Sequence, residues 1–199
     1  MDGVAIMANT ARLSRGWDDL RIEPVARTTN NAPSFEKWFD DAGGTSRGVY
    51  LYSFSKEVTN NQKEIFFTMQ MPHAWAATPI SIHAHWIPAD SQNSAVVIWG
   101  LEYAWADIGT EYGDTTIVYS SATLVPADAN LTAFRHYISE FADITPSANQ
   151  DGISSILIGR LFRYSGNASD TYDDKAGLLY IDAHIEIDTP SGSLTEYSK

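Results

Sequence analysis

GLLYIDAHIEID, residues 177–188, has the clearest structural period in the sequence. Apolar residues alternate there with residues that carry a polar group. The apolar set is Leu179, Ile181, Ala183, Ile185 and Ile187, and the alternating set is Tyr180, Asp182, His184, Glu186 and Asp188. A period of two places the two sets on opposite faces of a β-strand. The stretch therefore predicts a strand with one buried face and one polar face.

Short apolar runs between turn residues occur throughout the rest of the chain. They cover residues 19–24, 48–54, 64–71, 79–88, 94–105, 115–125 and 153–164. The run 94–105 is apolar on both faces, which is typical of a central strand that is covered on both sides. Two segments are ambiguous. Residues 131–144 fit a strand or a helical stripe and are taken as strand, and residues 34–41 fit a helical turn or an edge strand.

These runs predict an all-β protein with about eight or nine strands and no long helix. An antiparallel two-sheet sandwich, jelly-roll-like, is the natural way to bury them. The length of 199 residues fits one domain, which we expect over residues 17–199. Residues 1–16 show no sustained period and are expected to form an N-terminal arm. This arm would be either disordered or ordered on a neighbouring subunit.

Charge and composition exclude several classes of function. The chain has 25 acidic and 13 basic residues, a formal net charge of −12, and it contains no cysteine. The missing cysteines exclude disulfides, thiolate metal sites and cysteine nucleophiles. An acidic chain is repelled by nucleic acid and by anionic lipid, so neither is expected as a partner. No apolar run approaches the roughly 20 residues of a membrane-spanning helix, and no signal peptide is recognised at the N-terminus.

The histidines are the first candidates for chemistry. His83 and His85 lie two residues apart on a predicted strand and therefore share a face. With Asp90 and His184 they form a set that suits iron, manganese or zinc and that resembles the cupin arrangement. However, Pro88 interrupts the stretch, and the glycines that frame the cupin motif are missing.

The interpretation we prefer is a pair of interstrand hydrogen bonds, with Trp86 packed on the opposite face. We therefore expect no metal, no cofactor and no catalytic residue.

The acidic residues of the last strand are a second candidate. Asp182, Glu186 and Asp188 surround His184, and paired carboxylates can hydrolyse glycosides. Solvent and a basic partner are also enough to stabilise such a row of acidic side chains, without any catalytic role. We expect a salt-bridged sheet face, with Arg160 or Arg163 of the preceding strand as that partner.

Other catalytic motifs are missing, and the aromatic residues allow two interpretations. The sequence contains no G-x-S-x-G elbow, no G-x-G-x-x-G loop and no Walker loop. Most tryptophans lie among apolar strand residues, which favours a core or a subunit contact. The alternative is a sugar-binding platform, for which Trp75 and Trp105 are the candidate side chains.

Several motifs together resemble a known group of proteins. They are WDDLRI (17–22), MPHAW (71–75), IHAHW (82–86), VIWGLEYAWADI (97–108), GRLFRY (159–164), DTYDDKAGLLYIDAHIEID (170–188) and GSLTEYSK (192–199). In this order they resemble a widespread family of uncharacterised proteins of tailed bacteriophages, prophages and marine viral metagenomes. The resemblance implies a virion-associated structural protein and supplies no catalytic residues.

We therefore expect a non-enzymatic structural protein of a bacteriophage virion, acting as a head decoration, head–tail or tail component. It would form a homo-oligomer, with a trimer as the first expectation, and pack on other particle proteins. Two alternatives stay open. One is a carbohydrate-binding module of a receptor-binding or decoration protein, with a glycan as ligand. The other is a cupin-like metal-dependent enzyme using His83, His85, Asp90 and His184.

Overall fold

A computed structural model describes residues 15–25, 31–44, 47–57 and 62–188. These residues form strands, turns and loops and contain no helix, so the all-β prediction is confirmed. The strands are β1 (Gly16–Ile22), β2 (Ser34–Asp40), β3 (Gly48–Phe54), β4 (Glu64–Gln70), β5 (Ser81–Pro88), β6 (Gln92–Asn93), β7 (Trp99–Ala106), β8 (Thr116–Val125), β9 (Asn130–Leu131), β10 (Tyr137–Phe141), β11 (Ile156–Arg163) and β12 (Ala176–Ile187). Within the described ranges, no helix has the length and apolar character needed to span a bilayer.

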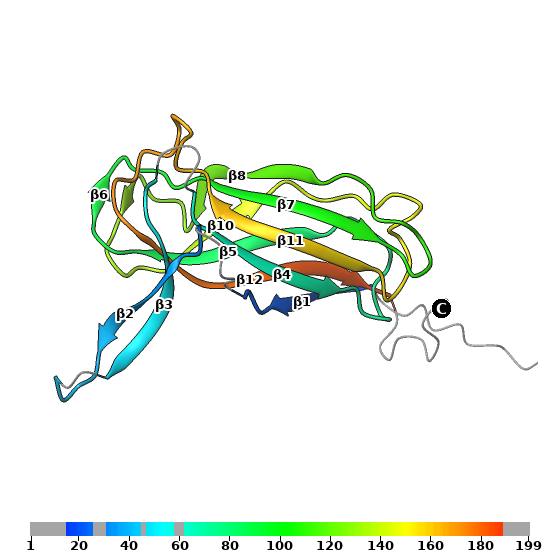
Figure 1. Cartoon of the computed structure of the whole chain (residues 1–199), viewed down its shortest axis with the longest axis horizontal. Coiled ribbons are helices and arrows are strands. Elements are labelled where there is room, and N and C mark those ends of the chain that lie inside the picture. Colours follow the sequence, from blue (N-terminus) through cyan, green and yellow to red (C-terminus); the bar gives the residue numbers. More distant parts are fainter. Residues whose placement is uncertain (1–14, 26–30, 45–46, 58–61, 189–199) are drawn as a thin grey trace, which may run out of the picture.

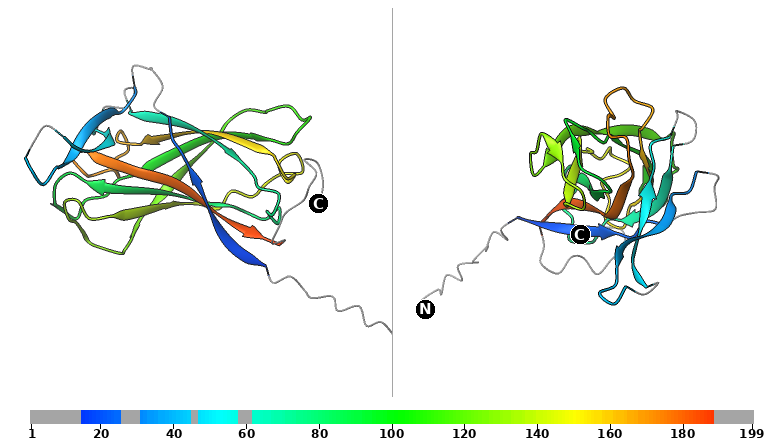
Figure 2. Two further views of the ribbon diagram at one scale, coloured as in Figure 1. Left: turned by 90° about the horizontal axis from the view of Figure 1, so that it is seen from below. Right: turned by 90° about the vertical axis from the view of Figure 1, so that its left-hand side faces the viewer.

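Ten of the strands belong to one curled antiparallel sheet with the order β2-β3-β12-β5-β10-β8-β7-β11-β4, to which β1 adds beside β12. Strand β8 joins the two halves of this sheet. Its first part pairs with β7, where Tyr119 faces Gly100, and its second part pairs with β10, where Leu124 faces Ser139. The result is a jelly-roll-like sandwich whose strands surround a common interior (Figures 1 and 2).

The chain segment that follows β1 pairs with β4, the strand at one end of the sheet order. β1 pairs with β12 along its whole length. Three residues after β1 ends, Val25 exchanges two backbone hydrogen bonds with Phe66 of β4, at 2.7 and 3.2 Å. The N-terminal segment therefore connects β12 with β4, the strand at one end of the sheet order.

The predicted faces of β12 are confirmed over most of its length. Ile181, Ala183 and Ile185 are buried in the core, as the alternation predicts. The prediction is wrong for Leu179, which is only partly buried, while Leu178 lies in the core. The reason is a register shift between Leu178 and Tyr180 in the pairing with β5, because a bulge displaces the alternation by one residue.

Aromatic side chains fill much of the interior. Phe54 packs against Trp99 with ring centroids 5.0 Å apart, and Trp86 lies 6.3 Å from Trp99. The Trp86 indole N–H donates a hydrogen bond to Ser139 Oγ at 3.0 Å. Trp86 therefore lies on the core side of β5, opposite the histidines, as predicted.

The two ambiguous segments have different structures. Residues 34–41 contain the edge strand β2 rather than a helical turn. The segment 131–144 is not one continuous strand, because it starts with the end of β9, turns near Phe134 and continues as β10. Phe134 has a positive φ of 60°, which breaks the extended backbone there. The expected arm lies outside the described residues except for its last two, Arg15 and Gly16.

Candidate functional site

Histidine and aspartate side chains gather on the outer face of β5 and β12. Because Ile82, Ala84 and Trp86 of β5 point into the core, the alternating His83 and His85 point outward. Asp182 is the direct partner of His83 in the antiparallel pairing of β12 with β5. His83, His85 and Asp182, here called the histidine–aspartate cluster, are only 5, 5 and 4 % exposed.

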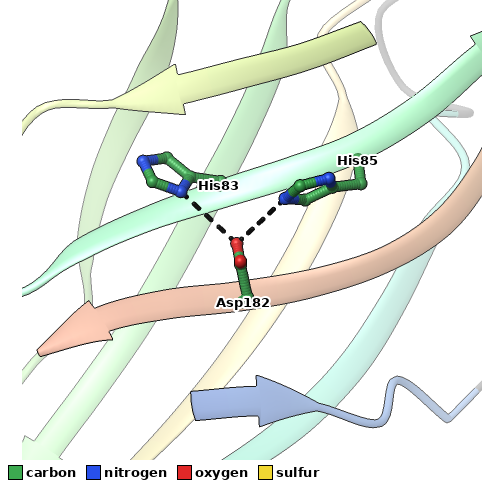
Figure 3. A group of neighbouring side chains, drawn as sticks. All are labelled: His83, His85 and Asp182. Atoms are coloured by element: carbon green, nitrogen blue, oxygen red, sulfur yellow. Dashed lines mark hydrogen bonds and ion pairs between the residues drawn. The ribbon is translucent and has the colours of Figure 1, made fainter. Parts of the chain in front are cut away.

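Both imidazoles of this cluster approach the same carboxylate oxygen (Figure 3). His85 Nε2 lies 3.2 Å from Asp182 Oδ1, and His83 Nδ1 lies 3.4 Å from that oxygen. Burial by itself would raise the pKa of the Asp182 carboxyl. Hydrogen bonds from the two histidines and their electrostatic interaction with the carboxylate outweigh burial and hold the pKa of Asp182 well below its ordinary value. The carboxylate therefore stays ionised, and it ties β5 to β12.

The second ring nitrogen of each histidine also has a neighbour. His85 Nδ1 lies 2.9 Å from His136 Nε2. Burial, and then the charge of His85, lower the pKa of His136, which favours a neutral ring there. His83 Nε2 lies 3.4 Å from Ser81 Oγ and 4.0 Å from Glu140 Oε1. Both rings are therefore held at two positions, which fixes their orientation.

His184 and Asp19 form a second group beside Asp182, and both side chains are partly exposed to solvent. His184 Nε2 lies 3.0 Å from Asp19 Oδ1 of β1 and 3.9 Å from Asp182 Oδ2. The His184 ring is 4.3 Å from the His83 ring, in an edge-to-face arrangement. The polar face of the sheet thus places His83, His85 and His184 around one buried carboxylate, and His136 contacts the far side of the His85 ring.

The metal set suggested by the sequence is wrong in one member. His83, His85 and His184 do lie together, but Asp90 lies elsewhere. Its backbone N–H donates to Tyr172 Oη at 2.9 Å, and a hydrogen bond with Asp174 raises the pKa of its carboxyl. Asp182 takes the expected place of Asp90. Sequence spacing missed it because 97 residues separate it from His85.

The expected basic partner of the acidic row is also wrong. Arg160 pairs with Glu64 and Glu102, at 2.5 Å each, rather than with β12. The reason is strand order: β11 precedes β12 in the chain but lies between β7 and β4 in the sheet.

Arg163, the other expected partner, pairs with Asp170. Within the row itself, Glu186 pairs with Arg15 at 3.4 Å and Asp182 with the histidines.

The favoured core interpretation of the tryptophans is confirmed for Trp75 and Trp105, and the sugar-platform alternative is wrong for these two residues. Trp75 and Trp105 are buried in the core, with their ring centroids 5.6 Å apart. The Trp105 indole N–H donates to Ser155 Oγ at 3.0 Å. A ring that is covered on its faces by protein offers no platform for a sugar, so these two residues do not form a glycan site.

A second candidate surface lies on the hairpin of β2 and β3, which stands off from the sandwich (Figure 1). Its large exposed apolar side chains, here called the hairpin surface, are Phe35, Phe39, Val49 and Tyr50. Phe35 stacks on Tyr50 on one face, with ring centroids 5.6 Å apart. A register shift after Lys37 pairs Phe39 with Val49, which places both on the other face. The hairpin is therefore apolar on both faces.

Two hollows lie away from the histidine–aspartate cluster. One, of about 690 Å³, lies on the outer face of β4, β11 and β7 around Arg160. The other, of about 480 Å³, lies between the hairpin and β12 and includes Phe35, Tyr50 and Tyr180. None of the five histidines lines either hollow.

No protein-family model matches the chain, and no curated protein matches it.

Proposed function

We propose that this protein is a non-enzymatic structural subunit of a bacteriophage virion that forms a homo-oligomer and packs on other particle proteins. The position in the particle would be a head decoration, head–tail or tail component. The proposal rests on the resemblance of the ordered motifs and on one structural observation. That observation is the hairpin of β2 and β3, which carries the hairpin surface away from the sandwich.

The hairpin has the physical properties of a contact element. Phe35 is 61 % exposed and Tyr50 is 42 % exposed, on two strands that have apolar residues on both faces. β3 pairs with β12 only at its Phe54 end, so the outer part of the hairpin is a two-stranded ribbon. Such a ribbon is marginally stable in water, so burial against another surface would stabilise it. β2 also ends the strand order and has no strand on its outer side within the described residues. Its edge and its aromatic rings together offer hydrogen bonds and apolar area to a second copy.

The charge of the protein agrees with this role. A net charge of −12 keeps the subunit away from packaged nucleic acid and favours contact with basic patches of other shell proteins. The two alternatives have less support. The glycan-binding alternative loses its two named aromatics to the core, and the cupin-like enzyme loses Asp90 from its ligand set.

The mass of the full-length chain in solution, measured by light scattering, tests the self-association. We expect a multiple of the 22.0 kDa chain mass, with three copies as the first expectation. The double variant Phe35→Ser/Tyr50→Ser is expected to reduce the mass to that of one chain. The matched control Ile108→Ser/Ile117→Ser changes two exposed side chains outside the hairpin and should leave the mass unchanged. A wild-type mass of 22.0 kDa at every concentration would contradict the proposal.

The virion assignment needs its own measurement. Mass spectrometry of gradient-purified particles of the virus that encodes the chain should find its peptides in a fixed ratio to the major capsid protein. Particles that lack these peptides would contradict the assignment, whatever the mass in solution.

A further inference from the structure

We propose that His83, His85 and Asp182 bind one divalent transition-metal ion of the zinc class, which cross-links β5 to β12 on the outer face of the sheet. This inference goes beyond the proposed function and does not depend on it. It departs from the sequence-based expectation that the chain uses no cofactor. Three observations carry it: the spacing of the donor atoms, the burial of the donors and the second partners of both imidazoles.

The spacing of the donor atoms fits a common metal ion better than ordinary ion pairs. One ring nitrogen each of His83 and His85 and a carboxylate oxygen of Asp182 all lie within 4.8 Å of one another. The two nitrogen–oxygen distances are 3.4 and 3.2 Å. Ligands about 2.0–2.1 Å from a tetrahedral zinc ion are about 3.3–3.4 Å apart. Charge-assisted hydrogen bonds between such groups are shorter, about 2.7–2.9 Å.

The orientation of the rings supports the same conclusion. Both imidazoles point a nitrogen toward the carboxylate, from two positions along β5 (Figure 3). The nitrogens on the far sides of the rings have partners: His136 Nε2 for His85, and Ser81 Oγ and Glu140 Oε1, at 3.4 and 4.0 Å, for His83. In metal sites the second nitrogen of a ligating histidine is held in this way, which fixes the ring and its tautomer.

The donor set selects the class of ion. Two imidazoles and one carboxylate suit zinc and neighbouring transition metals, whereas magnesium and calcium prefer sites made of oxygen atoms. The three side chains are almost fully buried although they lie on an outer sheet face, so few water molecules compete for the ion. The His184 ring, 4.3 Å from the His83 ring, is the nearest further imidazole for a fourth position.

The test is zinc titration of the full-length chain, first stripped of metal with a chelator, by isothermal calorimetry. We expect one ion per chain in the wild type. His83→Gln and His85→Gln should each weaken binding by more than about 100-fold, because loss of a ligand exceeds the 10- to 100-fold effect of an outer partner. His73→Gln is the matched control, because His73 lies outside the cluster beside Ser154. It should bind like the wild type.

Two further measurements do not depend on the variants. Zinc, but not magnesium, should raise the unfolding temperature of the wild type in a concentration-dependent way, since it binds the folded state. Cobalt(II), used as a spectroscopic probe, should give the strong visible absorption of a tetrahedral site. His136→Gln should weaken zinc binding by about 10- to 100-fold as a positioning change.

Three results would overturn the proposal. The first is no saturable zinc binding to the wild type at millimolar concentration. The second is unchanged affinity in folded His83→Gln and His85→Gln chains, with the fold checked by circular dichroism. The third is a loss of binding only in Asp19→Asn or His184→Gln, which would place the ion at the exposed neighbouring group.

Discussion

Arg163 and Asp170 form a two-point ion pair that is completely shielded from solvent. Arg163 Nε lies 3.0 Å from Asp170 Oδ2, and Arg163 Nη2 lies 2.7 Å from Asp170 Oδ1. The guanidinium also donates to the backbone carbonyls of Phe54, Tyr172 and Asp174. Asp170 in turn accepts the backbone N–H of Ile98 at 3.0 Å. The GRLFRY and DTYDD motifs therefore meet in one buried network, which fixes the loop between β11 and β12.

Asp170→Asn should reduce the free energy of unfolding by about 3 to 5 kcal/mol, because it leaves the Arg163 charge buried without its counter-ion. Urea titration measures this change. The double variant Arg163→Met/Asp170→Leu should stay destabilised, because the carbonyls of Phe54, Tyr172 and Asp174 then lose their donor. Recovery of wild-type stability in the double variant would mean that these carbonyl contacts contribute little.

Two core tryptophans give a matched comparison. Trp86 donates its indole N–H to the buried Ser139 Oγ, whereas Trp99 Nε1 is buried without a hydrogen-bond partner among the described residues. Trp86→Phe should therefore cost about 1 kcal/mol more than Trp99→Phe, since it also breaks a hydrogen bond. Chemical unfolding of both variants measures the difference. Equal costs would show that the Ser139 contact adds nothing to stability.

Gly159 of β11 allows the Phe67 ring to lie directly against the backbone. A Cβ at this position would lie 2.4 Å from Phe67 Cζ, which is too close for any side chain. Gly159→Ala should therefore cost about 1 to 3 kcal/mol through overpacking. Gly113→Ala is the control, because a Cβ there has no neighbour within 4 Å, and it should change stability by less than about 0.5 kcal/mol. Thermal unfolding compares them, and equal melting temperatures would contradict this packing.

Glu102 should make the stability depend on acid pH. A hydrogen bond from Thr115 lowers the pKa of its carboxyl; burial opposes this, and Arg160 lowers it further. Because the folded pKa lies below that of the unfolded chain, the stabilisation is present above about pH 4.3 and is lost as the pH falls.

Glu102→Gln should therefore cost about 1 kcal/mol at pH 7 and much less at pH 3. Urea titrations at the two pH values measure both differences. A cost that is the same at both values would exclude this carboxylate as a source of the acid sensitivity.

Local patterns in the sequence predicted the all-β class and most of the faces of β5 and β12. The alternation around Asp182 placed Ile181 and Ala183 in the core, because successive side chains of a regular strand point to opposite faces. The shared outward face of His83 and His85 follows from the same rule. The shift at Leu178 could not be predicted, because that bulge depends on the pairing with β5.

Local patterns could not predict contacts between strands that are far apart in the sequence. The approach of Asp182 to His85 and the separation of Arg160 from β12 both depend on strand order, which the alternation does not contain. Trp75 and Trp105 lie in the core, which their apolar sequence neighbours favoured, although composition alone does not distinguish a buried ring from an exposed one. Whether a ring is buried depends on the packing inside the sandwich.

Hydrogen–deuterium exchange of the wild type at several protein concentrations tests the proposed self-association through the hairpin most directly. We predict that the amides of β2 and β3 become more protected as the concentration rises, in step with the mass in solution, while those of β8 do not change. Exchange of β2 and β3 that is the same at every concentration, in a chain that stays at 22.0 kDa, would contradict the account.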